Sequence, residues 1–193
     1  MLQYQFPSVW KLQNGNPQTI YIKIQLLLLH ISKLLLEKQV QTEQTQQAVD
    51  LSSILQHVVE KKCAALLPLP QLQITSVPSI AANAEKISNV FYHLISNAQQ
   101  ATEPEGRVII EVSYAAETDA VTVTISDDGH GMSREFIEQR LFTPFDTTKG
   151  NAGMGIGAYD AKQYIEEIGG KLQVHSEERI GSTFSLMLPI YSL

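Results

Sequence analysis

The chain has 193 residues, enough for one domain with an appendage or for one and a half domains, and 44% of them are hydrophobic, enough for a core. Its net charge of −6 argues against a nucleic-acid-binding surface. The single cysteine, Cys63, excludes an internal disulfide and a multi-cysteine metal site, and it fits a reducing compartment.

The N-terminal part of the chain, residues 1–47, predicts an appendage. Residues 1–19 predict irregular structure, and residues 20–38 predict a helix that is apolar almost all round. Such a helix needs a packing partner, either the domain or a second chain, so it is a candidate homodimer contact. It is too short and too polar to span a membrane, and the first residues lack the pattern of a signal peptide. The Gln/Thr-rich run 40–48 predicts a linker.

Residues 48–193 predict a domain of the α+β class, because helical apolar stripes mix with alternating β-branched runs. The first predicted element is a helix that starts at Asp50 or Ser52, continues to about Ala65 and is ended by Pro68 and Pro70. A strand over 72–77, a helix over 83–101 and strands over 108–114 and 120–126 follow. The last elements are a short helix capped by Ser133, a helix over 156–168, and strands over 171–176 and 183–188. This order predicts one mostly antiparallel sheet with helices covering one face.

Three side chains are candidates for binding chemistry. Asp127 follows a predicted strand, and its carboxylate can accept a hydrogen bond from an exocyclic amine such as that of adenine, although an acidic β-turn explains it equally well. Asn97 offers a neutral oxygen that suits Mg²⁺ together with phosphate oxygens and water, but taken alone it fits a helix-surface asparagine better. His93, one helical turn earlier, can contact phosphate or polarise a water, while a structural histidine is the commoner case.

A glycine cluster before the last predicted helix has the composition of a phosphate cradle, because its backbone N–H groups converge at a helix N-terminus. The cluster is neither a dinucleotide fingerprint nor a Walker loop, since no strand precedes it and no Gly-Lys-Ser/Thr closes it. A flexible, solvated loop is the simpler interpretation, and the polar run before the cluster is typical of a lid. The residues concerned are Thr147, Thr148, Lys149, Gly153, Gly155 and Gly157.

In this order and spacing, these features together resemble the ATP-binding catalytic domain of sensor histidine kinases, within the GHKL ATPase superfamily. The matching segments are His93–Ala98, Asp127–Met132, Leu141–Lys149, Gly153–Gly157 and Gly181–Phe184, where Arg179 replaces a usual glycine. The resemblance covers about residues 48–190. The run from Leu141 to Tyr164 is similar in particular to the PrsK-type histidine kinases of PEP-CTERM systems.

The resemblance implies a two-layer α/β sandwich of the Bergerat type and binding of ATP with Mg²⁺. It implies that Asn97 ligates the metal, that Asp127 binds the adenine amino group, and that His93, Asn97 and Lys149 serve the transfer of the γ-phosphoryl group. The implied nucleotide-binding residues are Asn97, Asp127, Gly129, Gly131, Met132, Phe142, Thr147, Thr148, Lys149, Gly153, Met154, Gly155, Ile156, Gly157 and Ser182.

The family transfers phosphate to a histidine that stands before an acid on a dimerisation hairpin, and then to a response regulator. His30 and His57, the upstream histidines here, are not followed by an acid, so we expect the hairpin to be absent or incomplete and the chain not to phosphorylate itself. The resemblance implies a catalytic domain on the cytoplasmic side of the inner membrane. The alternatives are a GHKL serine kinase or anti-sigma factor, and a non-catalytic ATP-binding module.

Overall fold

A computed structural model describes residues 47–144 and 156–192, which belong to one compact unit, Gln46–Leu193. The other unit, Met1–Thr45, lies outside the described residues, and so does the helix expected over 20–38. The described elements are β1 (Gln47–Val49), α2 (Leu51–His57), the π-helical segment η2 (Val58–Lys62), β2 (Gln71–Ile74), β3 (Ile80–Ala82), α3 (Ala84–Ala101), β4 (Val108–Ala115), β5 (Ala120–Asp127), α4 (Arg134–Gln139), α5 (Gly157–Glu167), β6 (Lys171–Glu177) and β7 (Gly181–Pro189).

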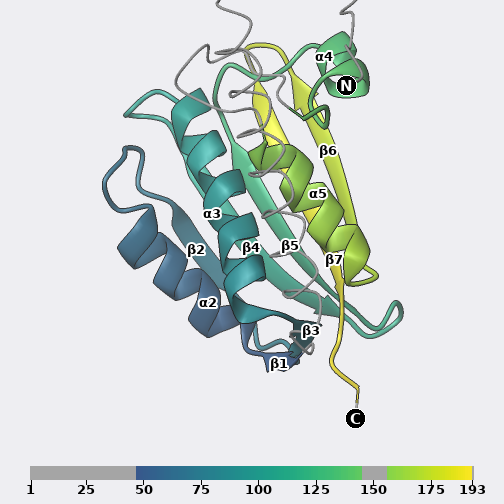
Figure 1. Cartoon of the computed structure of the whole chain (residues 1–193). Coiled ribbons are helices and arrows are strands. Elements are labelled where there is room, and N and C mark those ends of the chain that lie inside the picture. Colours follow the sequence, from purple (N-terminus) through teal and green to yellow (C-terminus); the bar gives the residue numbers. More distant parts are fainter. Residues whose placement is uncertain (1–46, 145–155, 193) are drawn as a thin grey trace, which may run out of the picture. The chain divides into compact units, whose positions relative to one another are not determined.

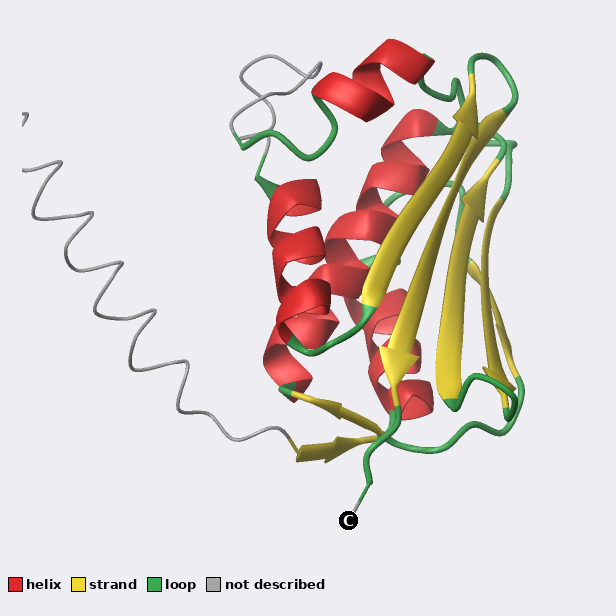
Figure 2. Ribbon diagram, turned by 90° about the vertical axis from the view of Figure 1, so that its right-hand side faces the viewer, coloured by secondary structure: helices red, strands yellow, loops and turns green. Residues whose placement is uncertain are grey.

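The main sheet has five strands in the order β2-β4-β5-β7-β6 (Figure 1). β2 runs parallel to β4, and the other neighbours are antiparallel. Helices α2, α3 and α5 cover one face of this sheet, as Figure 2 shows. The α+β sandwich with a mostly antiparallel sheet is therefore confirmed.

The core lies between that face and the helices, and it is built from rows of opposed side chains. Val123 of β5 pairs with Leu186 of β7, and Leu186 pairs with Leu172 of β6. The next row joins Ile125, Phe184 and Val174 in the same way. The four of these residues that belong to β5 and β7 are buried, namely Val123, Ile125, Phe184 and Leu186. Since alternate strand residues point to the same face, each row turns toward the helices.

Helix α3 forms where its apolar stripe predicts it. The buried residues of the stripe are Ile87, Val90, Phe91, Leu94, Ile95 and Ala98. Asn83 caps the helix, because its side-chain Oδ1 accepts a hydrogen bond from the backbone N–H of Lys86 at 3.0 Å. None of the described helices is long and apolar enough to cross a membrane.

Two sequence expectations differ from the structure. The helix that starts after Asp50 ends at Lys62 through a π-helical segment, and not near Ala65. The expected linker 40–48 overlaps β1, which pairs with β3 in a separate two-stranded sheet that was not predicted. Both strands have only three residues, too few for an alternating pattern to be recognisable.

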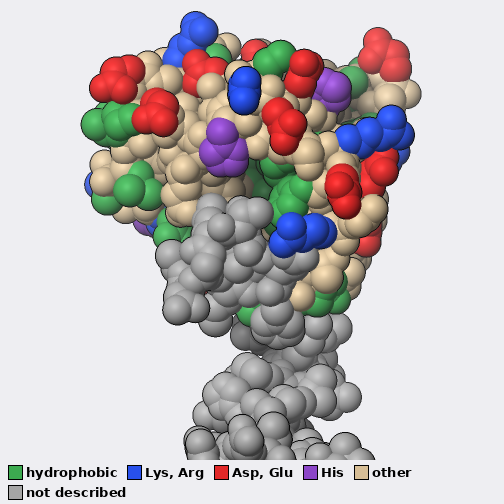
Figure 3. Space-filling model, turned by 90° about the horizontal axis from the view of Figure 1, so that it is seen from above, with side chains coloured by type: hydrophobic (Ala, Val, Ile, Leu, Met, Phe, Trp, Pro, Cys, Tyr) green, Lys and Arg blue, Asp and Glu red, His purple; other side chains and the backbone are tan. Residues whose placement is uncertain are grey.

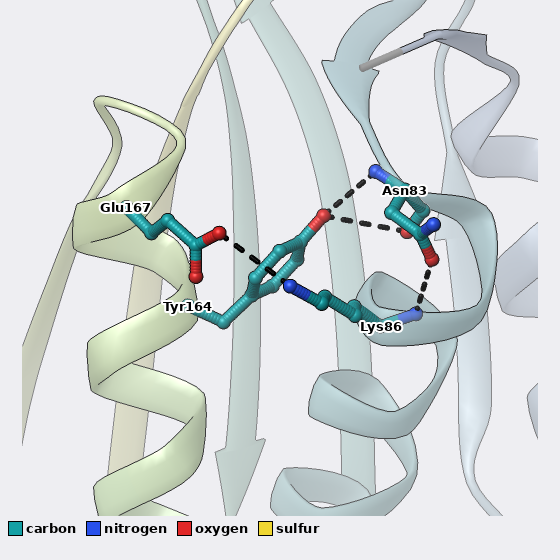
Figure 4. Close-up of polar contacts among 4 residues, drawn as sticks. All are labelled: Asn83, Lys86, Tyr164 and Glu167. Atoms are coloured by element: carbon teal, nitrogen blue, oxygen red, sulfur yellow. Dashed lines mark hydrogen bonds and ion pairs between the residues drawn. The ribbon is translucent and has the colours of Figure 1, made fainter. Parts of the chain in front are cut away.

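A polar cluster ties the second half of α5 to the start of α3 (Figure 4). The Tyr164 hydroxyl accepts a hydrogen bond from the backbone N–H of Asn83 at 2.7 Å and lies 3.4 Å from the Asn83 carbonyl oxygen, to which it can donate. Lys86 lies beside the Tyr164 ring and forms an ion pair with Glu167 at 3.4 Å. The cluster fixes how α5 packs along α3.

Candidate functional site

Four segments that are distant in the sequence meet at one end of the sheet. These are the C-terminal ends of α3 and β5, the first residues of α5, and the turn between β6 and β7, all at the top of Figure 1. Figure 3 looks onto this end and shows histidine, acidic and basic side chains around a recess that exposes hydrophobic side chains. The residues singled out in the sequence can be located one by one against this frame.

Asp127 is the last residue of β5, and its carboxylate is oriented by two backbone donors. Its Oδ1 accepts a hydrogen bond from Gly129 N–H at 3.0 Å and another from Ser182 N–H at 3.3 Å. Within the described part of the chain, Oδ2 accepts no hydrogen bond. Burial raises the pKa of Asp127, although both backbone hydrogen bonds and the nearby His130 act in the opposite direction. The carboxylate thus keeps one oxygen available to a ligand.

The glycine turn after Asp127 is held between α3 and the β6–β7 turn. The backbone N–H of His130 donates to the carbonyl oxygen of Ala101, the last residue of α3, at 3.0 Å. A side chain on Gly129 would collide with that same carbonyl, and Gly131 has a φ of +66° with the Glu177 carbonyl against it. These two positions therefore require glycine, because any Cβ would push the turn away from α3 or β6.

His93, Asn97 and Ala101 lie on one ridge of α3, because they are spaced four residues apart. At one end of the ridge, Gly157 of α5 lies so close that a Cβ on it would be 3.2 Å from the His93 ring. At the other end, Ala101 holds the glycine turn. Asn97 therefore lies between the start of α5 and the turn that follows Asp127, and its side chain is half-buried.

The start of α5 has a helix N-terminus without a side-chain cap. Ile156 is the N-cap residue, and its apolar side chain forms no capping hydrogen bond with the first helical N–H groups. These groups and the helix dipole favour an anion in front of Gly157. Phe142 is half-buried and packs against the hydrophobic core. The ammonium group of Lys162, a residue of α5, lies 4.7 Å from the centre of the Phe142 ring.

The structure thus brings together His93, Asn97, Asp127, Gly129, Gly131, Ile156, Gly157 and Ser182 at one end of the sheet. Met132 and Phe142 pack against the core beside them. The remaining residues of the predicted site lie outside the described residues, and nothing tests their placement. They are Thr147, Thr148, Lys149, Gly153, Met154 and Gly155.

One residue of this end was not singled out in the sequence. The Ser176 hydroxyl accepts a hydrogen bond from Met132 N–H at 2.8 Å, donates to the Gly181 carbonyl at 2.8 Å and lies 3.0 Å from the Ser182 hydroxyl. A signal was present, because the alternation of Leu172 and Val174 puts Ser176 on the inward face of β6, where a polar residue is unusual.

Residues 82–192 match the family of histidine kinase-, DNA gyrase B- and HSP90-like ATPases, and this match spans more than half of the chain. The chain belongs to this family. ATP binding is therefore implied for the domain.

The relatives found by sequence include a sensor histidine kinase and a sporulation kinase. The chain is 33% identical over 148 residues to the sensor histidine kinase ZraS of Escherichia coli strain K12, a match that covers 75% of this chain and 31% of ZraS. It is 32% identical over 117 residues to sporulation kinase E of Bacillus subtilis, which covers 61% of this chain and 15% of that protein. The chain thus spans about a third or less of the length of these relatives.

Solved structures share the fold. The mycobacterial sensor histidine kinase MprB superposes with a TM-score of 0.66 at 19% identity, covering 77% of this chain and 99% of that chain. The catalytic domain of histidine kinase ThkA gives a TM-score of 0.62 at 24% identity, covering 75% and 95%. The fold of this ATPase domain is accordingly that of histidine kinase catalytic domains.

Proposed function

We propose that this chain is the ATP-binding catalytic part of a sensor histidine kinase, with residues 48–193 as the catalytic domain and residues 1–47 as an appendage. It binds Mg-ATP and transfers the γ-phosphoryl group to a histidine on a dimerisation hairpin. The observation that carries this proposal is the convergence of two features beside the start of α5. One is Asp127, whose Oδ2 accepts no hydrogen bond from the described residues, and the other is the His93–Asn97 ridge of α3.

The adenine base belongs at the Asp127 end of this site. The available Oδ2 of Asp127 accepts a hydrogen bond from the exocyclic amino group, and the backbone donors on Oδ1 keep the carboxylate in place. Gly131 and Met132 lie beside the base. Ser182, which pairs with Asp127 across the strands, borders the same pocket.

The triphosphate runs from there toward the start of α5. The N–H groups in front of Gly157 suit phosphate oxygens, and Lys149 in the loop before them would add a positive charge. Thr147, Thr148, Gly153, Met154, Gly155 and Ile156 would complete the cradle as the loop closes over the nucleotide. Phe142 would anchor the start of this loop, because its ring already packs beside Lys162 of α5.

Asn97 fits a magnesium ion that the nucleotide brings with it. Among the described residues no three His, Cys, Asp or Glu side chains group together as a metal site. A magnesium ion at Asn97 would therefore take most of its ligands from phosphate oxygens and water, which this ion prefers. Mg²⁺ would neutralise phosphate charge, while His93 contacts the phosphates or the waters around the metal.

Transfer would depend mainly on positioning and charge neutralisation, because phosphoryl transfer needs little covalent chemistry from the protein. The acceptor histidine and the response regulator would be supplied by other segments or proteins. His57, at the end of α2, is exposed, but Val58 and not an acid follows it. The similarity to the sensor histidine kinase ZraS supports this class over a serine kinase or an anti-sigma factor.

The test combines binding and transfer. The purified chain is titrated with ATP and Mg²⁺ by calorimetry, then incubated with γ-labelled ATP and a separately produced hairpin from a related sensor histidine kinase. We expect saturable binding, acid-labile label on the hairpin and none on the chain itself. Asn97→Ala should abolish the metal-dependent part of binding. Absence of binding heat would refute the proposal, and acid-labile label on the chain itself would refute the dependence on a separate hairpin.

Two narrower proposals follow from the resemblance alone. The run from Leu141 to Tyr164 supports a PrsK-type kinase acting on the cytoplasmic side of the inner membrane, although about half of that run lies outside the described residues. Faster phosphotransfer through a PrsK-type hairpin and its regulator than through those of ZraS would support it, and equal rates would count against it.

A further inference from the structure

The core rows of the sheet end in a polar row at the nucleotide end. Asp127 of β5 pairs with Ser182 of β7, and Ser182 pairs with Ser176 of β6. This row follows the apolar row of Ile125, Phe184 and Val174, two residues further along each strand. The three polar side chains therefore turn toward the same face as the core, and Ser182 is itself buried, with an exposed fraction of 6%.

The hydrogen bonds of this row determine where the hydroxyl protons lie. A serine hydroxyl has one hydrogen to donate and two lone pairs to accept with. Ser176 gives its hydrogen to the Gly181 carbonyl at 2.8 Å and accepts from Met132 N–H at 2.8 Å. Its remaining contact, with the Ser182 hydroxyl at 3.0 Å, is therefore a hydrogen bond that Ser182 donates.

Once Ser182 has given its hydrogen to Ser176, its oxygen can only accept. The Oδ2 atom of Asp127 is also an acceptor, because it is a carboxylate oxygen, and it stays available because both backbone donors bind Oδ1. The two side chains nearest the expected base thus present acceptors alone. Acceptors favour a base edge that carries an amino group, as adenine does, and disfavour one that carries a carbonyl oxygen, as hypoxanthine and guanine do.

We propose that Ser176 is a positioning residue that holds the Ser182 hydroxyl as an acceptor and thereby makes the site select adenine over a 6-oxopurine. This inference rests on the proposed ATP binding and adds to it the residue that sets base choice. Ser176 acts through Ser182, and its other two hydrogen bonds join Met132, in the segment after Asp127, and Gly181, the first residue of β7, to β6.

The selectivity can be measured with two nucleotides that differ at one position. ATP and inosine triphosphate share the ribose and the phosphates, and inosine triphosphate carries a carbonyl oxygen in place of the amino group. Dissociation constants of both, with Mg²⁺, are determined by calorimetry for the wild-type chain, Ser176→Ala, Ser176→Thr and Ser182→Ala. The ratio of the two constants isolates base choice from changes in phosphate binding.

We expect the wild-type chain to prefer ATP by at least about tenfold, and Ser176→Ala to reduce this preference about three- to tenfold, the size of one hydrogen bond between neutral groups. In that variant the Ser182 hydroxyl is free to turn and donate to the carbonyl of inosine triphosphate. Ser176→Thr keeps a hydroxyl and should restore most of the preference. Ser182→Ala should also reduce it, because the acceptor is gone.

If the role of Ser176 were merely structural, Ser176→Ala would lower the melting temperature and weaken the binding of both nucleotides equally. An unchanged ratio in Ser176→Ala therefore overturns the inference, as does a wild-type chain that binds both nucleotides alike while the proposed ATP binding stands. If Ser176→Ala does not fold, an unchanged ratio in Ser182→Ala overturns it. A wild-type chain that binds neither nucleotide overturns the proposed function itself and this inference with it.

Discussion

Asp127 and Asp128 are neighbours in the chain, yet their carboxylates have different environments. Asp127 is half-buried and keeps Oδ2 available, whereas Asp128 is exposed and bound to the start of β4. Asp128 Oδ1 accepts a hydrogen bond from Arg107 N–H at 2.6 Å, and Oδ2 lies 3.5 Å from the Arg107 Nε. The first aspartate is available to a ligand, and the second holds the strand end in place.

This difference predicts unequal effects of the same substitution on ATP affinity. Asp127→Asn should weaken ATP binding by about 10- to 100-fold, because it replaces a charged acceptor by an amide whose N–H₂ group faces the amino group of the base. Asp128→Asn, the matched control, keeps an Oδ1 acceptor for Arg107 and should change ATP affinity less than about twofold. Calorimetric titration of both variants measures this, and equal losses would contradict the assignment.

Although Asp127→Asn should weaken ATP binding, it should leave the stability of the fold at neutral pH unchanged or raise it. Burial raises the pKa of Asp127 above its usual 3.8, so the ionised form is less favourable in the folded than in the unfolded chain. The charge therefore costs stability at neutral pH, and this cost is lost as the pH falls through the raised pKa. The variant should melt at the same or a higher temperature than wild type at pH 7, with the difference shrinking toward acid pH. A melting temperature several degrees lower at pH 7 would rule this out.

Among the candidate site residues, sequence reasoning could single out those whose residue type and local position carry a signal, and their roles stay predictions. Asp127 at a strand end and Asn97 one turn after His93 could be singled out in this way, and the structure brings them to the same end of the sheet. For Ser176 the sequence shows only a polar residue on the inward face of β6, and not its three hydrogen bonds, which join it to Met132 after β5 and to Gly181 and Ser182 of β7. Such contacts depend on strand register, which a single sequence does not contain.

At the scale of elements, α5 is held at two places along its length. Its first residue, Gly157, lies so close to the His93 ring that a Cβ on it would be 3.2 Å away, and the Tyr164 hydroxyl binds the N-cap residue of α3, Asn83. Two helical turns, about 10 Å, separate Gly157 from Tyr164. The second contact can therefore stabilise the packing of α5 on α3 without touching the nucleotide end (Figure 4).

We therefore expect Tyr164→Phe to destabilise the fold and leave ATP affinity unchanged. The change removes the acceptor of the Asn83 N–H, which costs about 1–2 kcal/mol and lowers the melting temperature by about 2–8 °C. Tyr114→Phe is the matched control, because it also loses one hydrogen bond, from an exposed hydroxyl to Asp119 at 2.8 Å. The control should cost less than about 0.5 kcal/mol. Equal melting temperatures for the two variants would show that the Tyr164 contact does not stabilise the packing.

Elements were predictable from sequence where local patterns are long. The 18 residues of α3 carry a complete apolar stripe, and the β4–β5 hairpin alternates over eight residues in each strand. β1 and β3 pair across about 30 residues of chain, so no local pattern shows either one. The parallel pairing of β2 with β4 also depends on contacts between distant segments.

At the scale of the whole molecule, the candidate site joins parts of the chain that the fold brings together from four separate places. His93 and Asn97 belong to α3, Asp127 to β5, Gly157 to α5 and Ser182 to β7. The apolar rows hold the strands in register, and the same register places Asp127 opposite Ser182. A ligand that contacts all four segments would bind only the folded chain.

Ligand binding should then raise the stability of the domain as a unit. At an ATP concentration 100 times the dissociation constant, with Mg²⁺ in excess, the gain is about 2.7 kcal/mol, or about 5–11 °C in melting temperature for a domain of this size. Chelating the metal with EDTA should remove most of this gain, because phosphate charge is then no longer neutralised at Asn97. Asp127→Asn serves as the control, since it should fold but show a much smaller shift. An equal shift with and without the metal would exclude the magnesium role, and a full shift in Asp127→Asn would place the nucleotide elsewhere on the molecule.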